Sequence, residues 1–526
     1  MANSPSQISR CIPIEVANLL ATALFLNGVL LAASTQAQSI TPAADGTGTQ
    51  VILNGQRYDI HGGSLSGDGA NLFHSFQEFG LSTGEIANFL ATPQLQNILG
   101  RVIGGNASII DGLIQISGGS PNLYLMNPAG MVFGPNARLN VPASFTATTA
   151  NRIGFGNGQW FNAAGPNDFS TLTGTPNQFA FTNPQPGSLV NASDLAVPTG
   201  HNLMLLGGSV VNTGKLSAPS GNITVAAVPG ESLVRVSQAG MLLNLEIEPL
   251  ATSGNTAPPS SSPSPSSPPS PLSLPELLTQ VNAHHATGIT VAADGSLHLT
   301  GSGLAISADP NTTIISGTLN ASTPHTPHPT PQAAGSINIL GDQIALLGAD
   351  LDASGPNGGG DIRIGGEFRG GGTLPRASQV IINENTNIAV DALDSGDGGR
   401  VIAWADELTH FYGNIHARGG PNGGDGGFVE VSGKENLDFK GQVDVSAQQG
   451  DAGTLLLDPE NITIVDGGPF IGNDLELTDN QILFSDSPGA NFTISTGQIL
   501  FQLLSGSVIL EATNSITINS LVLCQG

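Results

Sequence analysis

Closely spaced histidines are the residues of this chain whose chemistry suits a metal ion. His325 and His328 are separated by two residues, and His284 and His285 are adjacent. A metal site needs ligands that a rigid frame and surrounding hydrogen bonds hold in place. The first pair instead lies in a proline-rich stretch, "STPHTPHPTPQ", with no carboxylate or cysteine nearby. We therefore predict exposed loop histidines, no metal site and no cofactor.

Two segments rich in aspartate and glycine offer a weaker case for calcium. "DALDSGDGG" at residues 391–399 and "GPNGGDGG" at residues 420–427 resemble the calcium-binding nonapeptide G-G-x-G-x-D. That motif works by tandem repetition, and no nine-residue tandem is present here. Aspartate and glycine also suit tight turns on backbone grounds. Turns are the main prediction, and calcium binding is the alternative.

Catalytic motifs are missing from the sequence. It contains no G-x-S-x-G, no H-E-x-x-H and no phosphate-binding G-x-x-x-x-G-K-[ST]. Asp350 and Asp352 are two residues apart, so on a strand they would share a face, as a pair of carboxylates in a polysaccharide-cleaving enzyme would require. Because no basic residue lies near them in the sequence, we expect solvated turn carboxylates and no catalytic residue.

The stretch "NPAG" combines three residues that each favour a tight turn. Asn127, Pro128 and Gly130 suit positions i, i+1 and i+3 of a type I β-turn, because Asn closes the turn, Pro presets φ and Gly relieves the exit. The sequence "GPNA" at residues 134–137 predicts a second corner. Met131 then falls on a short strand between the two corners.

The elements around these residues are predicted to be strands. From about Ile40 onward, short runs of alternating apolar residues are separated by Gly, Asn, Asp and Pro. In "GGFVEVSG", Val429 and Val431 fall on one face, which is a strand pattern. Helical patterns are few, and residues 91–100 and 273–281 are predicted as short helices from their caps and apolar spacing.

The strand units recur along the chain. Glycines precede apolar runs at Gly360, Gly399, Gly427 and Gly453, with steps of 39, 28 and 26 residues by subtraction. Strand-rich, glycine-punctuated units of this irregular length indicate a β-solenoid, in which each coil buries its apolar face only by stacking on its neighbours. The predicted fold class is therefore all-β.

Composition excludes some partners. The chain has 526 residues, with 40 Asp and Glu against 14 Lys and Arg, and only 10% of residues are charged. Such a surface repels phosphate backbones and anionic membranes, so we predict no nucleic-acid partner. Of the two cysteines, Cys11 and Cys524, the first is expected to be removed with the N-terminal segment, so no internal disulfide is predicted.

The N-terminus has the pattern of a secretory signal peptide. Arg10 precedes an apolar run at residues 17–34, and the small residues Thr35 and Ala37 suit cleavage between Ala37 and Gln38. No later segment is long and apolar enough to span a bilayer as a helix. We therefore predict export and no stable membrane span.

Four regions follow from these patterns. Residues 1–37 form the signal peptide, and residues 38–250 form the first solenoid domain. Residues 251–273 form a linker, because their proline and serine content cannot build a core. Residues 274–526 continue the solenoid. They end in coil-like strands without the polar cap that solenoids need, so we expect a truncated C-terminus.

Three stretches together resemble a known family. They are "ANLFHSFQEFGLSTGEIANF", "NILGRVIGGNASIIDGLIQISG" and "NLYLMNPAGMVFGPNARLNVPASFTATTA". They are similar to the filamentous-haemagglutinin N-terminal domain, the secretion domain of two-partner-secretion exoproteins. Residues 127–131 match the family's Asn-Pro-Asn-Gly-Ile signature, with Ala at the third position and Met at the fifth. Downstream sequences such as "VIAWADELTHFYGNIHARGG" resemble large cyanobacterial exoproteins of this type.

The resemblance implies a fold and a route of export. The family fold is a right-handed parallel β-helix. Such chains cross the inner membrane by their signal peptide, bind the periplasmic domains of a dedicated outer-membrane β-barrel transporter and fold outside the cell. The signature assigns transporter recognition to Asn127, Pro128, Gly130 and Met131.

The function expected from the resemblance is that of a non-enzymatic exoprotein. It would be secreted, with cell-surface association, and would serve as a rod-like adhesin or structural protein. Its receptors would be surfaces or glycans of host or neighbouring cells. The alternatives from other classes are a β-helical enzyme that acts on polysaccharide and a calcium-stabilised surface-layer protein.

Overall fold

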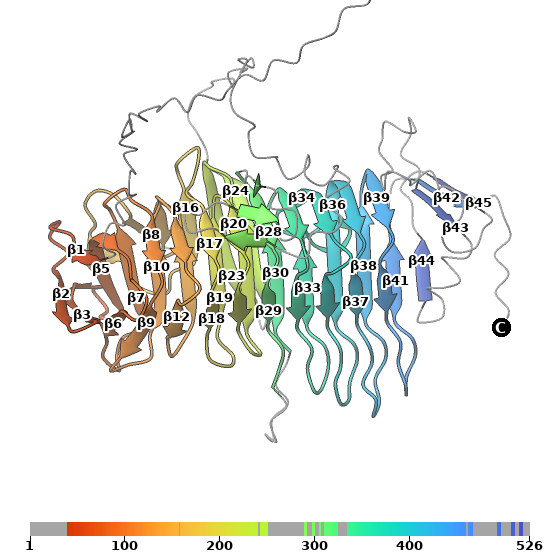
Figure 1. The fold of residues 1–526 in the computed structure, drawn as a ribbon, viewed down its shortest axis with the longest axis horizontal. Coiled ribbons are helices and arrows are strands. Elements are labelled where there is room, and N and C mark those ends of the chain that lie inside the picture. The colour runs from red at the N-terminus through yellow and green to blue at the C-terminus, as the bar shows by residue number, and fades with distance from the viewer. Residues whose placement is uncertain are drawn as a thin grey trace, which may run out of the picture. The chain divides into compact units, whose positions relative to one another are not determined.

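A computed structural model gives the fold of the chain (Figure 1). It separates a unit of Met1–Ala37 from a unit of Gln38–Gly526. The structure describes residues 39–156, 158–239, 242–250, 289–291, 297–299, 305–306, 310–324, 334–458, 461–465, 492–495, 507–510 and 515–518. Several features predicted from the sequence lie outside these residues. They are the signal segment, its cleavage site at Ala37 and Gln38, the linker, the second predicted helix, all four histidines of the two pairs and both cysteines.

Parallel strands from successive coils form a first stack, which runs through most of the fold (Figure 1). Each strand pairs in parallel with its counterpart one coil away. The strands are β5 (Asn71–Phe79), β7 (Asn97–Val102), β10 (Asn122–Met126), β13 (Phe145–Thr148), β19 (Leu203–Gly207), β22 (Asn222–Ala227), β30 (Ser336–Leu340), β33 (Asp361–Ile364), β36 (Arg400–Phe411), β38 (Phe428–Gly433), β41 (Thr454–Leu457) and β44 (Ser507–Leu510).

A second stack lies one corner further along each coil. It contains β8 (Ser108–Ile110), β11 (Met131–Phe133), β17 (Leu189–Asn191), β20 (Val210–Asn212), β28 (Thr312–Ile315), β31 (Gln343–Leu346), β34 (Ala377–Ile382), the C-terminal half of β36, and β39 (Asn436–Phe439). Because β36 is long enough to pair in both stacks, its coil has no loop at this corner.

The third stack is divided between two sheets. The first sheet contains β3 (Arg57–Gly62), β6 (Ile86–Leu90), β9 (Leu113–Ser117) and β12 (Arg138–Asn140). The second contains β18 (Asp194–Ala196), β21 (Lys215–Ser217), β29 (Thr318–Asn320), β32 (Asp350–Asp352), β35 (Asn387–Ala389), β37 (Asn414–His416) and β40 (Gln442–Asp444). Three parallel stacks per coil define a parallel β-helix, as predicted.

The glycine-led units predicted from the sequence are successive coils of the first stack. Asp361 pairs with Arg400, Arg400 with Phe428, and Phe428 with Thr454, which gives steps of 39, 28 and 26 residues. The glycine before each run is required by close backbone packing. A Cβ at Gly427, for example, would lie 2.2 Å from the carbonyl oxygen of the preceding coil.

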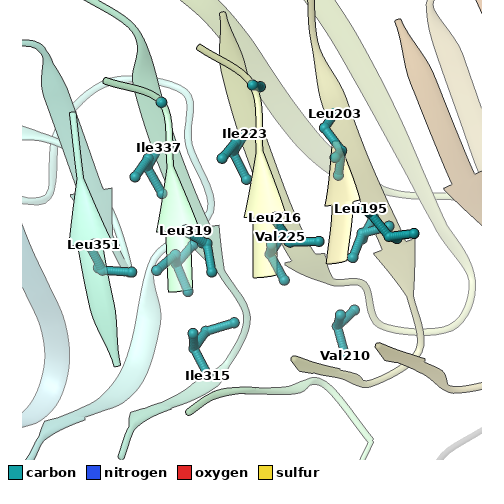
Figure 2. Close-up of a cluster of buried hydrophobic side chains, with 14 of the residues drawn as sticks. Leu195, Leu203, Val210, Leu216, Ile223, Val225, Ile315, Leu319, Ile337 and Leu351 are labelled. Atoms are coloured by element: carbon teal, nitrogen blue, oxygen red, sulfur yellow. The ribbon is translucent and has the colours of Figure 1, made fainter. Parts of the chain in front are cut away.

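The core is a set of apolar ladders inside the coils (Figure 2). Leu203, Ile223 and Ile337 are partners in adjacent strands, and all three are fully buried. Full burial of one such side chain contributes about 1.5–3 kcal/mol, and the ladder repeats this gain in every coil. Burial of apolar side chains is therefore continuous from coil to coil along the ladder.

Antiparallel strands cover the N-terminal coil. β1 (Ile40–Pro42) and β4 (Ser64–Leu65) pair with β5, and β2 (Thr49–Asn54) pairs with β3. These strands satisfy hydrogen-bonding groups that the first coil would otherwise leave open to edge pairing.

A second antiparallel sheet comes from chain segments inserted between the first and second stacks. Its order is β15 (Trp160–Asn162), β14 (Arg152–Gly154), β16 (Gln178–Phe181), β23 (Ser232–Ala239) and β24 (Leu242–Pro249). It buries apolar residues that the first stack points outward. Phe73, Leu99 and Tyr124 pack with Phe161 and Phe179 in one cluster. The first-stack strands under this sheet therefore carry apolar residues on both faces.

The remaining elements are two short turns and two small sheets. Two three-residue 3-10 turns lie at Phe169–Thr171 and Phe368–Gly370. Two small sheets contain β25 (Ile289–Val291), β26 (Leu297–Leu299) and β27 (Ala305–Ile306), and β42 (Asn461–Val465), β43 (Phe492–Ser495) and β45 (Ser515–Ile518).

The helix predicted over residues 91–100 is wrong. Asn97–Val102 is strand β7, which pairs in parallel with β5 and β10. Ile98 faces the solenoid core, whereas Leu99 faces the cluster under the inserted sheet. Because this strand is buried on both faces, its apolar residues occur at a spacing that also fits a helix. Its pairing with the neighbouring strands makes the segment a strand.

Candidate functional site

The NPAG corner connects β10 in the first stack to β11 in the second. The carbonyl oxygen of Asn127 accepts a hydrogen bond from the Gly130 N–H at 3.0 Å, which closes the turn. The Asn127 Oδ1 also accepts the Ala129 N–H at 3.0 Å. Gly130 has a φ of 117°, a backbone conformation that residues with a side chain rarely adopt. The corner is thus fixed by its own hydrogen bonds.

The Asn127 side chain points into the protein. Its Nδ2 donates to the Asn106 carbonyl oxygen at 3.0 Å and to Ser108 Oγ at 2.9 Å, both in the preceding coil. Only 1% of Asn127 is exposed. A partner protein therefore has no direct access to this amide, which acts by positioning the turn.

The following coil packs against the other side of the corner. The Met131 N–H donates to the Ser188 carbonyl oxygen at 3.0 Å. At Gly187, a Cβ would lie 2.6 Å from the Pro128 carbonyl oxygen, so only glycine fits there. Met131 itself is 1% exposed and faces the core. The corner is therefore held between two neighbouring coils.

Of the four signature residues predicted from the sequence, one reaches the surface. Asn127, Gly130 and Met131 are buried, while Pro128 is half-buried. Ala129, which occupies the departure from the signature, is exposed. The surface that this corner offers to a partner is therefore made by Pro128 and Ala129.

The second corner, residues 134–137, has the same hydrogen-bonding pattern. The Gly134 carbonyl oxygen accepts the Ala137 N–H at 3.0 Å. Asn136 is exposed, and its backbone N–H donates to Asp111 Oδ1 at 2.9 Å. Burial alone would raise the pKa of Asp111, but hydrogen bonds from Thr83 and Asn136 outweigh burial and lower it. This corner provides a matched comparison for NPAG.

A groove of 390 Å³ opens beside the NPAG corner. Pro128 and Ala129 line it, together with Ile103, which follows strand β7 in the preceding coil. The inserted sheet contributes Asn151 and Arg152 to the lining. Sequence reasoning did not single out Arg152, because its place beside the corner depends on how residues 149–187 fold back.

The other residues considered for chemistry lie apart from this corner. Asp350 and Asp352 share the outer face of β32, as expected, while Leu351 between them is buried. Burial and the nearby charge of Asp352 raise the pKa of Asp350. Asp352 accepts the Ser354 N–H at 2.9 Å, so this carboxylate closes a turn.

The Asp/Gly segments form coil corners. The Asp425 N–H donates to Asp397 Oδ1 at 2.8 Å, and the Asp451 N–H donates to Asp425 Oδ1 at 2.9 Å. These carboxylates thus bind the backbone of the next coil. Within the described ranges, no three His, Cys, Asp or Glu side chains are grouped so that they could hold a metal ion.

One polar cluster was missed at the sequence level. His410 Nδ1 lies 3.2 Å from Asp438 Oδ2, and Tyr412 also donates to that carboxylate. Lys440 Nζ lies 3.8 Å from the same oxygen. The four residues lie in, or directly after, the second-stack strands β36 and β39. Paired residues of these strands are 28 positions apart in the sequence, so no local pattern reveals the cluster.

Comparison with known families assigns the N-terminal region. Residues 37–255 match the family model of the TPS secretion domain. This region is a TPS secretion domain. The NPAG corner, its groove and the inserted antiparallel sheet all lie within the TPS domain, while the coils beyond it extend the same β-helix. No helix within the described residues has the length and apolar character to cross a membrane.

Solved structures of secretion domains are similar to the chain. The HMW1 secretion domain from Haemophilus influenzae has 22% sequence identity and a TM-score of 0.42, with 80% of this chain and 100% of that chain covered. The filamentous hemagglutinin secretion domain has 12% identity and a TM-score of 0.32, with 92% and 100% covered. No curated protein matches the sequence.

Proposed function

We propose that residues 38–250 carry the export information of a secreted exoprotein. After cleavage between Ala37 and Gln38, this domain binds the periplasmic domains of an outer-membrane two-partner-secretion transporter. The observation that carries the proposal is the TPS family match over residues 37–255. The chain then folds outside the cell, where the parallel coils can form one after another on the first.

Within this domain, we propose that the NPAG corner is the recognition element. Asn127, Gly130 and Met131 hold its shape from inside, and Pro128 and Ala129 present it. The turn is closed by hydrogen bonds within residues 127–130, so it can form before the coils stack, and a turn formed in advance loses little conformational entropy when a partner binds it. The signature therefore combines residues that build the turn with residues that face the partner.

The coils beyond the domain are proposed to form an adhesin-like or structural rod without enzymatic activity. In support, Asp352, which was considered for catalysis, and Asp397 and Asp425, from the segments considered for calcium, each accept a backbone N–H at a turn. The proposed location is extracellular, with association to the cell surface. The proposed receptors are surfaces or glycans of host or neighbouring cells.

The test is co-expression of the full chain with its transporter, with the secreted protein measured in the medium. Removal of residues 38–250 should abolish transporter-dependent secretion. Undiminished secretion of that deletion variant would refute the proposal. The corner is tested by Ala129→Trp, which places a large side chain at its exposed position without filling the core. The matched control is Asn136→Trp, at the equivalent turn position of the second corner.

A further inference from the structure

A second groove, of 700 Å³, lies at the corners between the third and first stacks, in the coils beyond the TPS domain. It crosses five successive coils, because the first residue of each of five paired first-stack strands lines it. These residues are Ser336, Asp361, Arg400, Phe428 and Thr454. Adjacent strands lie about 4.8 Å apart, so the groove is about 19 Å long. A site of this length fits a linear polymer better than a compact small molecule.

Aspartates recur in this groove with the spacing of the coils. Asp397, Asp425 and Asp451 each stand three residues before the first-stack strand of their coil, and all three are exposed. Asp397 Oδ1 accepts the Asp425 N–H, and Asp425 Oδ1 accepts the Asp451 N–H. These bonds fix the first two carboxylates through one oxygen each. Their Oδ2 atoms have no hydrogen bond to the described residues, so they can accept one from a ligand.

Glycines keep the space beside these carboxylates open. Two glycines separate Asp397 from the strand that begins at Arg400, and two separate Asp425 from the strand that begins at Phe428. A Cβ at Gly398 would lie 2.2 Å from a backbone carbonyl oxygen of the next corner, so the packing of the coils requires glycine there. No side chain therefore fills the groove between the carboxylate and the start of the strand.

An aromatic ring and a cation also line the groove. Phe428 is half-buried, and its ring centroid lies 5.7 Å from the guanidinium carbon of Arg400. The Phe368 ring packs edge-on to Phe428 at 5.7 Å, and 40% of Phe368 is exposed. Aromatic rings offer large apolar surfaces, and a guanidinium group donates hydrogen bonds to oxygen atoms. The groove thus combines acceptors, a donor and an apolar surface.

This combination matches the chemistry of a linear, uncharged glycan. Such a chain presents hydroxyl groups and the apolar C–H faces of its rings in turn, and each sugar residue occupies about one strand-to-strand step. Carboxylates and arginine form strong hydrogen bonds with hydroxyl groups. The exposed aspartates repel anionic sugars, whereas Arg400, in the middle of the five strands, repels a run of positive charge such as that of a basic peptide.

We infer that this groove binds a linear, uncharged glycan. Hydroxyl groups of successive sugars are bound by Asp397, Asp425 and Asp451, and one sugar ring packs on Phe428. The inference rests on the proposed adhesin role and adds the site and the chemical class of the ligand. The groove lies outside the TPS domain and is complete only after the coils have stacked, so it acts after export. Affinity should rise with glycan length until the chain spans the five coils.

The test measures binding of linear hexasaccharides to the purified, secreted full chain by calorimetry. The neutral probes are β-1,4-glucan, β-1,4-mannan and α-1,4-glucan hexasaccharides, and the anionic probe is a galacturonate hexasaccharide. At least one neutral probe should bind, and the galacturonate should not. Phe428→Ala should weaken binding about tenfold, because it truncates an aromatic anchor. Its control is Leu393→Ala, which removes an apolar side chain that is 54% exposed and does not line the groove.

Asp425→Asn tests the carboxylates without removing a backbone contact, because asparagine keeps an oxygen for the Asp451 N–H. It should weaken binding of the neutral glycan about threefold, since a hydrogen bond to a neutral acceptor is weaker than one to a carboxylate. It should also reduce the exclusion of the galacturonate. The matched control is Asp342→Asn, which removes an exposed charge between β30 and β31, outside the groove.

The outcomes separate this inference from the adhesin role. If no neutral hexasaccharide binds, if the galacturonate binds equally well, or if Phe428→Ala and Asp425→Asn bind like wild type, the groove inference is overturned. Attachment of the same chain to neighbouring cells would then still support the adhesin role, and loss of both kinds of binding from wild type means that both fail. Tighter binding of a hexalysine peptide than of every glycan would assign the groove to basic peptides and also overturn the inference. Equal melting temperatures of the variants show that folding is not the cause.

Discussion

Asn127 Nδ2 donates a hydrogen bond to Ser108 Oγ at 2.9 Å, across the boundary between two coils. The same amide binds the Asn106 carbonyl oxygen, and its own oxygen closes the turn at Ala129. One side chain thereby sets both the shape of the corner and its register on the preceding coil. Loss of this side chain would therefore affect the surface formed by Pro128 and Ala129 only through a change in the position or shape of the turn.

The first prediction concerns Asn127→Ala. The substitution leaves a buried carbonyl oxygen and hydroxyl without their donor, so it should lower the free energy of unfolding by about 1–3 kcal/mol. Loss of export by this variant would then be accompanied by a lower melting temperature. Asn136→Ala in the exposed second corner serves as control and should have a smaller effect. Equal melting temperatures for Asn127→Ala and wild type would contradict the buried role.

The second prediction concerns the pair of Arg101 and Asp45, at 2.8 Å. Arg101 is 3% exposed, and it also donates to Ser75 Oγ and to the Asn162 carbonyl oxygen. It thus joins the N-terminal cap, the first stack and the inserted sheet. Removal of one partner from a buried pair costs about 3–5 kcal/mol, so Arg101→Met should strongly lower the melting temperature. Arg57→Met, which breaks an exposed pair, is the control.

The same pair predicts an acid-sensitive stability. Burial alone would raise the pKa of Asp45, but hydrogen bonds from Ser75, Thr47 and Arg101 outweigh it and lower the pKa to about 2. Because the folded state holds the charged form more strongly than the unfolded state, this stabilisation is complete above about pH 4 and is lost as the pH falls toward 2. Melting curves of Asp45→Asn should show a smaller decline over that window than wild type. A parallel decline would contradict the assignment.

Much of this architecture could be predicted from the sequence, because it depends on patterns that every coil repeats. The alternating runs and the glycines before them predict parallel coils, and those glycines are fixed by close backbone packing, as at Gly427. The NPAG residues predict a turn for local backbone reasons. The turn is specified by neighbouring residues, and the coils by a pattern that recurs along the chain.

The rest depends on contacts between distant segments. Strands β14 to β16 have the same alternating character as coil strands, and they pack as a separate sheet on outward-facing residues such as Phe73 and Leu99. Leu99 also explains the wrong helix prediction. It is buried under the inserted sheet, outside the solenoid core, and the sequence of one strand does not reveal that this second face is covered.

The third prediction concerns His74, which is fully buried. Among the described residues, neither ring nitrogen has a hydrogen-bond partner, and the ring packs beside Phe76 and Phe89. Burial, with a contribution from His61, lowers the pKa of His74 to about 3. The unfolded state therefore takes up a proton first, and the protein loses stability as the pH falls from about 6.5 toward 3.

His74→Leu should remove this loss. The leucine is apolar and of similar size, and it leaves no unpaired nitrogen in the core. Relative to wild type, the stability gained by the variant should be about 2 kcal/mol larger at pH 5 than at pH 8, which corresponds to 1.5 pKa units. The measurement is the melting temperature of both proteins at the two pH values. A difference that does not change with pH would show that His74 is protonated without cost in the folded state.

The fourth prediction concerns Glu430, which is 0% exposed in strand β38. Its carboxylate accepts the Arg369 backbone N–H at 3.0 and 3.2 Å, which fastens the short turn at residues 368–370 to the first stack. Burial raises the pKa of Glu430 to about 7, although the hydrogen bond from the Arg369 backbone opposes the rise. The unfolded state releases its proton near pH 4.5, so stability falls as the pH rises from about 4.5 to 7 and changes little above that.

Glu430→Gln should abolish this dependence, because glutamine keeps an acceptor for the Arg369 N–H and carries no charge. At pH 8 the variant should be more stable than wild type by up to about 3 kcal/mol, and at pH 4.5 the two should be nearly equal. Glu435→Gln, an exposed substitution in the bend after the same strand, should show no such trend. Melting temperatures between pH 4.5 and 8 test this directly. If Glu430→Gln is less stable than wild type at pH 8, the buried carboxylate is charged and held by its hydrogen bonds, and the turn at Arg369 depends on that charge.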